Sequence, residues 1–185
     1  MEKGTVALIS VVIIIIGFAI VVYNGIVRKR NTVESAWSNI DVQLQRRFDL
    51  IPNLVESVRA YAKHERELFE RIAVLRTTFE RATSPKEIGE IDQQMSLAVK
   101  RLFAIAEGYP DLKASQNFLM LQESLAGTEN RIAYSRNNYN HAVMSYNTAI
   151  QTFPGVLFAG LFGFRLKEFF EAEDSLTREN VKVEI

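Results

Sequence analysis

The feature that most constrains this chain is a run of 24 residues, positions 4–27, that contains no charged side chain. The central part of the run, residues 6–22, is almost entirely aliphatic. At about 1.5 Å of rise per residue, 20 apolar helical residues match the roughly 30 Å hydrocarbon core of a lipid bilayer. The run therefore predicts a transmembrane helix, and residues 1–30 are interpreted as a membrane anchor with a basic flank.

The alternative to a retained anchor is a cleaved signal peptide. Signal peptides have apolar regions of about 7–15 residues and end at a small-residue cleavage site. The run in this chain is longer, and no such site precedes Tyr23. The sequence therefore favours the anchor.

The charges on either side of the run predict its orientation. Arg28, Lys29 and Arg30, the basic flank, follow it directly, whereas Lys3 stands on the other side together with Glu2. Because Lys and Arg next to a span tend to stay in the cytoplasm, we expect a single-pass protein whose following domain is cytoplasmic. The alternative is the reversed topology, with the basic flank against anionic lipid headgroups.

The remainder of the chain has the composition of one domain. Residues 31–185 carry 18 basic and 21 acidic side chains, a net charge of −3, which argues against nucleic acid as a partner. The chain has no cysteine, so disulfides and thiolate zinc sites are excluded. We interpret residues 31–170 as a helical-bundle domain and residues 171–185 as a polar tail.

Apolar residues recur at helical spacing just after the basic flank. They are Val33, Trp37, Ile40, Leu44, Phe48, Ile51, Val55, Val58, Ala62, Phe69, Ile72 and Phe79. This stripe predicts one helix over residues 31–81 that continues from the transmembrane helix and extends about 75 Å. Arg46 and Arg47 are expected mostly off the stripe. Pro52 lacks the amide that would bond the carbonyl of Phe48, so we expect a kink there rather than a break.

Capping and helix-breaking residues divide the rest of the chain into further helices. Ser84 and Pro85 are typical of a helix start, and a second long helix is expected to stop near Gly108. A third is expected over residues 111–151, ended by residues 153–155. The predicted class is all-α: an N-terminal transmembrane helix that continues into an antiparallel bundle of three long helices plus a short fourth.

The short fourth element, residues 156–164, is an apolar patch that is too short to cross a membrane. Its large side chains include Phe158, Leu161, Phe162 and Phe164. We expect the patch to close the bundle, with Phe169 and Phe170 completing the core, because an up-down-up path ends far from the membrane. The alternative is an interfacial or partner-binding patch.

Two groups of polar residues are unusual for a plain bundle. One surrounds the proline, and the other lies on the third long helix, where a Tyr pair and an Asn pair are each spaced by seven residues and so share a face. The candidates are Arg46, Arg47, Asp49, Pro52, Asn53, Asn130, Tyr139, Asn140, Tyr146 and Asn147. We interpret them as residues that fix helix register, and the alternative is a polar interface for another protein or another copy.

No motif in the chain predicts catalysis, a cofactor or a metal site. His64 is followed by Glu65 but by no second histidine at the spacing of a zinc motif, and the chain has no glycine-rich phosphate loop. The enzyme alternative would need His64, Glu65 and His141 to meet in space as metal ligands.

Longer motifs carry a resemblance to a known family. They are residues 37–44, 46–55, 61–65, 109–114 and 129–132, followed by Tyr139-Asn140 and Tyr146-Asn147 ahead of Phe153-Pro154. With these motifs the chain resembles the LemA family over nearly its whole length. The resemblance implies a single-pass protein of the bacterial cell membrane with a helical domain and no established catalytic activity.

Three functions remain as hypotheses. The first is a membrane-anchored helical scaffold, without catalysis, that forms a homo-oligomer or organises an envelope complex. The second is an adaptor for a membrane protease or another envelope protein, or a membrane-shaping factor. The third is an enzyme.

The basic flank generates a prediction about topology. A reporter that is active only in the cytoplasm should be active when fused after Ile185, because Arg28, Lys29 and Arg30 hold the domain on that side. A reporter that is active only in the periplasm, fused at the same position, serves as the control. Activity of the control reporter alone would contradict the predicted orientation.

Overall fold

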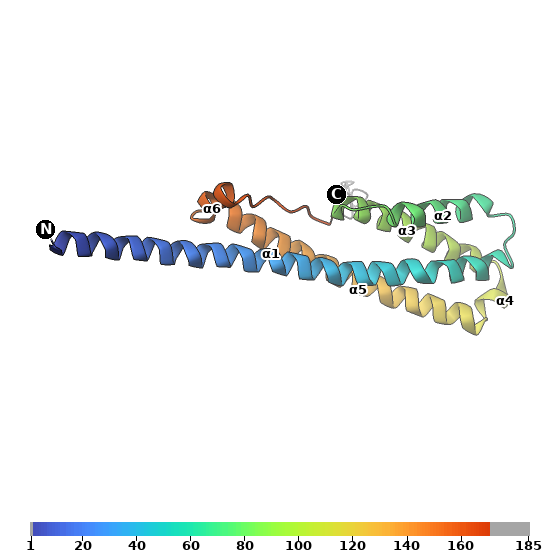
Figure 1. The fold of residues 1–185 in the computed structure, drawn as a ribbon. Helices are drawn as coiled ribbons and strands as arrows, with labels where there is room; N and C mark the ends of the chain where they lie inside the picture. The colour runs from blue at the N-terminus through green and yellow to red at the C-terminus, as the bar shows by residue number, and fades with distance from the viewer. Residues whose placement is uncertain (1, 171–185) are drawn as a thin grey trace, which may run out of the picture. The chain divides into compact units, whose positions relative to one another are not determined.

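The structure is a computed structural model that describes residues 2–170, and it is helical throughout its regular elements (Figure 1). The helices are α1 (Glu2–Arg59), α2 (Arg66–Phe79), α3 (Pro85–Ala106), α4 (Pro110–Lys113), α5 (Gln116–Gln151) and α6 (Gly155–Phe162). The all-α class and an apolar N-terminal helix that runs directly into a helical domain are confirmed. The predicted polar tail, residues 171–185, lies outside the described residues.

The chain divides into two compact units. Within the described residues, unit 1 contains residues 2–39 and 137–167, and unit 2 contains residues 40–136 and 168–170. Helices α1 and α5 each contribute to both units.

Helix α1 changes character along its length. Its first part is apolar on all sides and unburied, with a mean hydropathy of 3.1 over 18 residues, and it is the one helix in residues 2–170 that is long and apolar enough to cross a membrane. From Ile26 onward a buried stripe begins, which continues through Val33 and Ile40. The helix runs through Pro52 to Arg59 without a break.

The segment predicted as one helix over residues 31–81 is two helices, so that prediction was wrong. Helix α1 ends at Arg59, and α2 returns along it after a short connection. The rings of Phe48 and Phe79 stack with centroids 3.9 Å apart and planes at 9°, whereas in a continuous helix they would be about 46 Å apart. The Arg59 guanidinium also lies 5.0 Å from the centre of the Phe69 ring. These contacts bury the apolar face of α2, and this burial explains the reversal.

The other helices of unit 2 largely follow their sequence signals. The Ser84 side chain accepts a hydrogen bond of 3.2 Å from the amide of Glu87, so the predicted start of α3 is confirmed. The third long helix starts at Gln116 rather than at Asp111, because residues 110–113 form the separate short helix α4. The buried hydrophobic residues of α5 are Phe118, Leu125, Ile132, Tyr139, Val143, Tyr146 and Ile150. Five of these are spaced by seven, which is typical of a helix packed along one seam.

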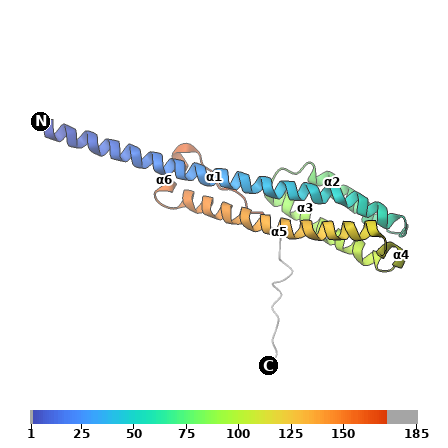
Figure 2. The same ribbon diagram turned by 90° about the horizontal axis from the view of Figure 1, so that it is seen from below.

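In unit 1, the end of α5 lies beside α1, as Figures 1 and 2 both show. The Trp37 and Tyr139 rings are 5.3 Å apart, and Lys29 Nζ donates a hydrogen bond of 2.7 Å to Ser145 Oγ. The expectation that the third long helix ends far from the predicted membrane span was therefore wrong. The extra reversal between α1 and α2 is the reason, because it brings the end of α5 back to the start of the buried stripe.

The stacked pair in unit 2 generates a prediction about stability. Replacing Phe79 by Ala should lower the free energy of unfolding of the full chain by about 3–5 kcal/mol, because Phe79 is 7% exposed and its ring covers Phe48. Urea unfolding in detergent, followed by far-UV circular dichroism, measures the change. Val74→Ala is the matched control, since Val74 lies on the same helix and is 62% exposed. Equal effects of the two substitutions would contradict the reversal.

Candidate functional site

A buried charged cluster joins three helices of unit 2. Arg47 of α1 is 3% exposed, and its Nη1 donates a hydrogen bond of 2.9 Å to Oδ1 of Asp92 on α3. The same nitrogen lies 2.8 Å from Oε2 of Glu129 on α5. Asp92 is itself buried, whereas the Glu129 side chain is half exposed. We call Arg47, Asp92 and Glu129 the Arg47 cluster.

The electrostatics of the Arg47 cluster are dominated by burial. Burial raises the pKa of Asp92 above its ordinary value, the Arg47 guanidinium opposes this effect, and the charge of Glu129 adds to it. In addition, Arg47 Nε is buried and makes no hydrogen bond within residues 2–170. The hydrogen bonds of the Arg47 cluster therefore do not fully offset the free energy of removing its charges from water. This is typical of buried ion pairs that fix which helices meet and in what alignment.

The prediction that Arg47 lies off the apolar stripe was wrong. Arg47 lies three residues after Leu44 and four before Ile51, both of which are buried. Of the neighbours grouped with it, Arg46, Asp49 and Asn53 are exposed. Asp49 accepts a hydrogen bond of 3.1 Å from the Gln45 side chain of its own helix.

The partners of Arg47 were missed because they are distant in sequence. Asp92 carried a usable signal, since it lies four residues after Ile88 and three before Met95, among the buried residues of α3. A carboxyl group at such a core position needs a cation or a hydrogen-bond donor beside it, or it is protonated. Glu129 carried no comparable signal because its side chain is half exposed.

Pro52 has a different environment from the Arg47 cluster. It is half-buried and lines an open groove between α1 and α2, together with Phe69 and Met95. The rim of this groove includes Arg76 and Glu80, which form an ion pair of 3.6 Å.

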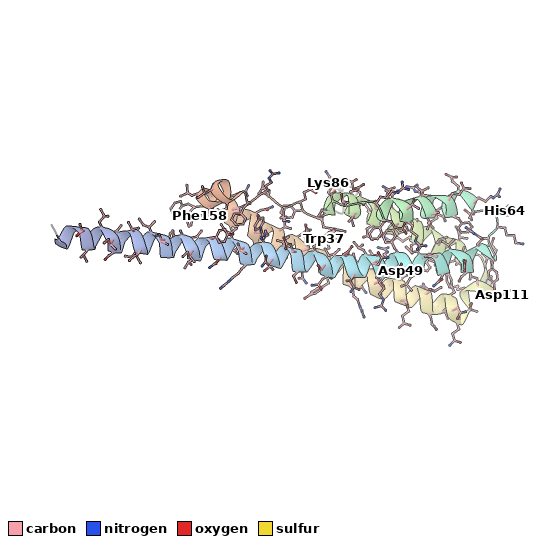
Figure 3. All side chains as sticks on the ribbon, viewed as in Figure 1. Trp37, Asp49, His64, Lys86, Asp111 and Phe158 are labelled. Atoms are coloured by element: carbon pink, nitrogen blue, oxygen red, sulfur yellow. The ribbon has the colours of Figure 1, made fainter. Side chains whose placement is uncertain are left out.

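The Tyr and Asn candidates of α5 are only partly buried. Tyr139 and Tyr146 are 2% and 1% exposed, Asn140 is half-buried, and Asn130 is exposed. Trp37, which packs on Tyr139, is labelled in Figure 3. The two tyrosines therefore belong to the packed interior.

Asn147 binds main chain rather than a facing helix. Its Nδ2 donates to the carbonyl of Lys167 and its Oδ1 accepts from the amide of Lys167, both at 2.9 Å. This pair of hydrogen bonds holds the segment that returns after α6. The carboxyl end of α6 is formed by Gly163, whose φ of 68° lies in the left-handed region that favours glycine.

Helix α6 packs against α1 at the end of the apolar span. The Tyr23 ring lies 4.9 Å from that of Phe162 and 5.7 Å from that of Phe164. Gly155 is buried, and a side chain at this position would collide with the carbonyl oxygen of Ala149 and would contact Ile26. No larger residue fits at this close approach.

The outer side chains of α6 remain uncovered. Phe158 and Phe164 are half-buried, but Leu161 is 78% exposed and Phe162 is 52% exposed. The patch thus folds back on α1 through Phe162 and Phe164, but within α6 only Gly155 is buried. Phe158 is labelled on α6 in Figure 3.

The last two residues expected in the core differ from each other. Phe170 is 1% exposed, as expected of a core residue, whereas Phe169 is 40% exposed.

Over residues 2–170 there is no group of three or more His, Cys, Asp or Glu side chains that could hold a metal ion.

The sequence of this helical domain matches a known family. The profile of the LemA family covers residues 36–185. This chain belongs to the LemA family. Membership agrees with the resemblance found in the motifs, and the matched region includes the Arg47 cluster, Asn147 and α6.

The relatives with similar sequences carry two kinds of name. Magnetosome protein MamQ 2 of Paramagnetospirillum magneticum is 27% identical over 175 residues, which cover 80% of this chain and 64% of the relative. Magnetosome protein MamQ of Magnetospirillum gryphiswaldense is 27% identical over 174 residues, with the same coverage. Protein LemA of Metamycoplasma hominis is 30% identical over 134 residues, covering 70% of this chain and 60% of the relative. The chain thus spans less than two thirds of the length of these curated relatives.

The raised pKa of Asp92 generates a prediction about pH. Between its folded and unfolded pKa values the folded chain binds more protons at Asp92 than the unfolded chain does, so this group adds stability as the pH falls. The free energy of unfolding of the wild type, minus that of Asp92→Asn, should therefore rise as the pH is lowered from 7 towards the ordinary aspartate range.

Urea unfolding at a series of pH values measures this difference. The control is Asp49→Asn, which makes the same chemical change at an exposed carboxylate of α1. A difference for Asp92→Asn that shrinks on acidification would contradict the raised pKa.

Proposed function

We propose that this LemA family member is a membrane-anchored, non-catalytic helical scaffold that self-associates and so organises an assembly in the bacterial envelope. The observation that carries the proposal is the dual character of α1. One helix supplies both an apolar span and the stripe on which the helical domain packs. A domain that packs on the same helix as its membrane anchor is suited to presenting a binding surface next to the membrane.

The exposed side of the span supports the anchoring part of the proposal. Leu8, Ile14 and Val21 are 67%, 69% and 70% exposed, so nothing within residues 2–170 covers them. In water such a surface would be strongly unfavourable, and in a bilayer it is solvated by lipid chains.

An uncovered face of α5 supports self-association. In unit 2, Leu119, Met120 and Tyr134 are 49%, 57% and 70% exposed. At 100° per residue they share the side of α5 that is opposite its buried seam. A second copy of the chain is the proposed occupant of this face.

The names of the relatives are consistent with an assembly function. Two of the relatives described above are called magnetosome proteins, a name that refers to a structure and not to a reaction. This likeness supports a structural role for the chain.

The mass of the protein in native nanodiscs tests the scaffold. We expect a multiple of the 21.1 kDa chain mass without another polypeptide. Leu119→Ser with Tyr134→Ser should reduce the multiple, whereas Val74→Ser, an exposed apolar residue on α2, is the control and should leave it unchanged. A single-chain mass at all concentrations would contradict self-association. A stoichiometric second polypeptide would instead favour the adaptor hypothesis.

A further inference from the structure

Helix α6 presents an uncharged, apolar surface for which residues 2–170 provide no cover. All eight of its residues are apolar or glycine. The exposed fractions of Val156, Leu157, Leu161 and Phe162 are 46%, 64%, 78% and 52%. Contiguous exposed apolar side chains of this kind mark a contact with another molecule or with lipid.

The position of α6 relates this surface to the apolar span. Phe162 and Phe164 pack on Tyr23, and Gly155 lies against Ile26. Tyr23 and Ile26 both belong to the last turns of the uncharged run, residues 4–27. The exposed surface of α6 is therefore continuous with the exposed surface of the span.

The depth of Tyr23 in a bilayer follows from helix geometry. The aliphatic run, residues 6–22, is centred on Ile14, and Tyr23 lies nine residues further, or about 14 Å along the helix axis. Half the thickness of the hydrocarbon core is about 15 Å. Tyr23 is thus at the boundary between acyl chains and headgroups, where tyrosine is enriched, and the rings that pack on it lie at a similar depth.

The charges of unit 1 suit an anionic surface. Beyond the span, unit 1 contains the basic flank together with Arg165 and Lys167, but Glu34 is its one acidic residue. Residues 130–167 include no Asp or Glu at all. The Arg30 guanidinium lies 6.0 Å from the centre of the Phe164 ring, so cationic and apolar groups stand next to each other, as in interfacial membrane helices.

We propose that α6 is an interfacial membrane helix that inserts Leu157, Leu161 and Phe162 at the boundary between acyl chains and anionic headgroups, beside the point where α1 leaves the bilayer. The inference rests on the anchoring part of the proposed function. The occupant of the α6 surface is lipid and not a second copy of the chain.

Site-directed spin labelling of the full chain tests the inference. The chain has no cysteine, so one introduced cysteine gives one label site. Three variants, Leu161→Cys, Ile14→Cys and Val74→Cys, place the label on α6, on the span and on the exposed side of α2. Each is reconstituted into vesicles of phosphatidylethanolamine and phosphatidylglycerol, and collision rates are measured with oxygen, which enters lipid, and with a nickel chelate, which stays in water.

We expect the oxygen-to-nickel collision ratio at Leu161 to exceed that at Val74 several-fold, and the ratio at Ile14 to be higher still. A ratio at Leu161 equal to that at Val74 would overturn the inference while leaving the anchor intact. Low access of both reagents to Leu161, with spin–spin broadening that disappears on dilution with unlabelled chain, would assign the surface to a second copy and would also overturn it. A low ratio at Ile14 would overturn the anchor itself, and with it the inference.

Discussion

The backbone hydrogen bonds of α1 determine how the other helices can pack. In a lipid environment every amide and carbonyl must find its partner within the chain, so an apolar span of this length has to be helical. Neither glycine nor proline occurs between Arg28 and Trp37, so the same ladder of hydrogen bonds continues beyond the span. The rotational phase of the buried stripe, from Ile26 through Val33 to Ile40, is therefore set by the helix that forms the span.

Packing on this stripe requires specificity as well as apolar area. Apolar helices can slide by one turn at little cost, but a buried guanidinium cannot be moved away from its carboxylates without leaving a charge unpaired. In unit 2, Arg47 contacts Asp92 on one helix and Glu129 on another, so a single nitrogen ties three helices together. Burial is the main cause of the raised pKa of Asp92, and the opposing charge of Arg47 does not cancel it. We therefore regard the Arg47 cluster as a determinant of helix register rather than a source of net stability.

Much of the fold could be predicted from the sequence because local signals act over a few residues. The uncharged run, the three-and-four spacing of apolar residues and the Ser84 cap each determine a local conformation, and each is present in the structure. The end of α1 at Arg59 could not be predicted, because residues 60–65 include neither glycine nor proline. That reversal depends on the burial of Phe69 and Phe79 against α1, which only the folded chain provides.

The same missed reversal explains the errors in the candidate site. One additional change of direction decides whether α5 ends near the span or away from it, so the expected position of α6 was wrong. The pairing of Arg47 with Asp92 joins residues 45 positions apart and has no local signature except a carboxylate on an apolar face. Asn147 is unusual in the sequence, but its hydrogen-bond partner is the main chain of Lys167. A pattern of side-chain types cannot predict a main-chain partner.

The central claim is that one uninterrupted helix is both the anchor and the spine of the domain. Hydrogen–deuterium exchange of the full chain in lipid vesicles tests it most directly, at the backbone amides of residues 28–39, where the span passes into the stripe. Amides in a continuous, packed helix exchange slowly, whereas those of a flexible connection exchange almost as fast as in an unfolded chain. We expect these amides to be as protected as those of residues 44–55, and rapid exchange confined to residues 28–39 would contradict a continuous helix.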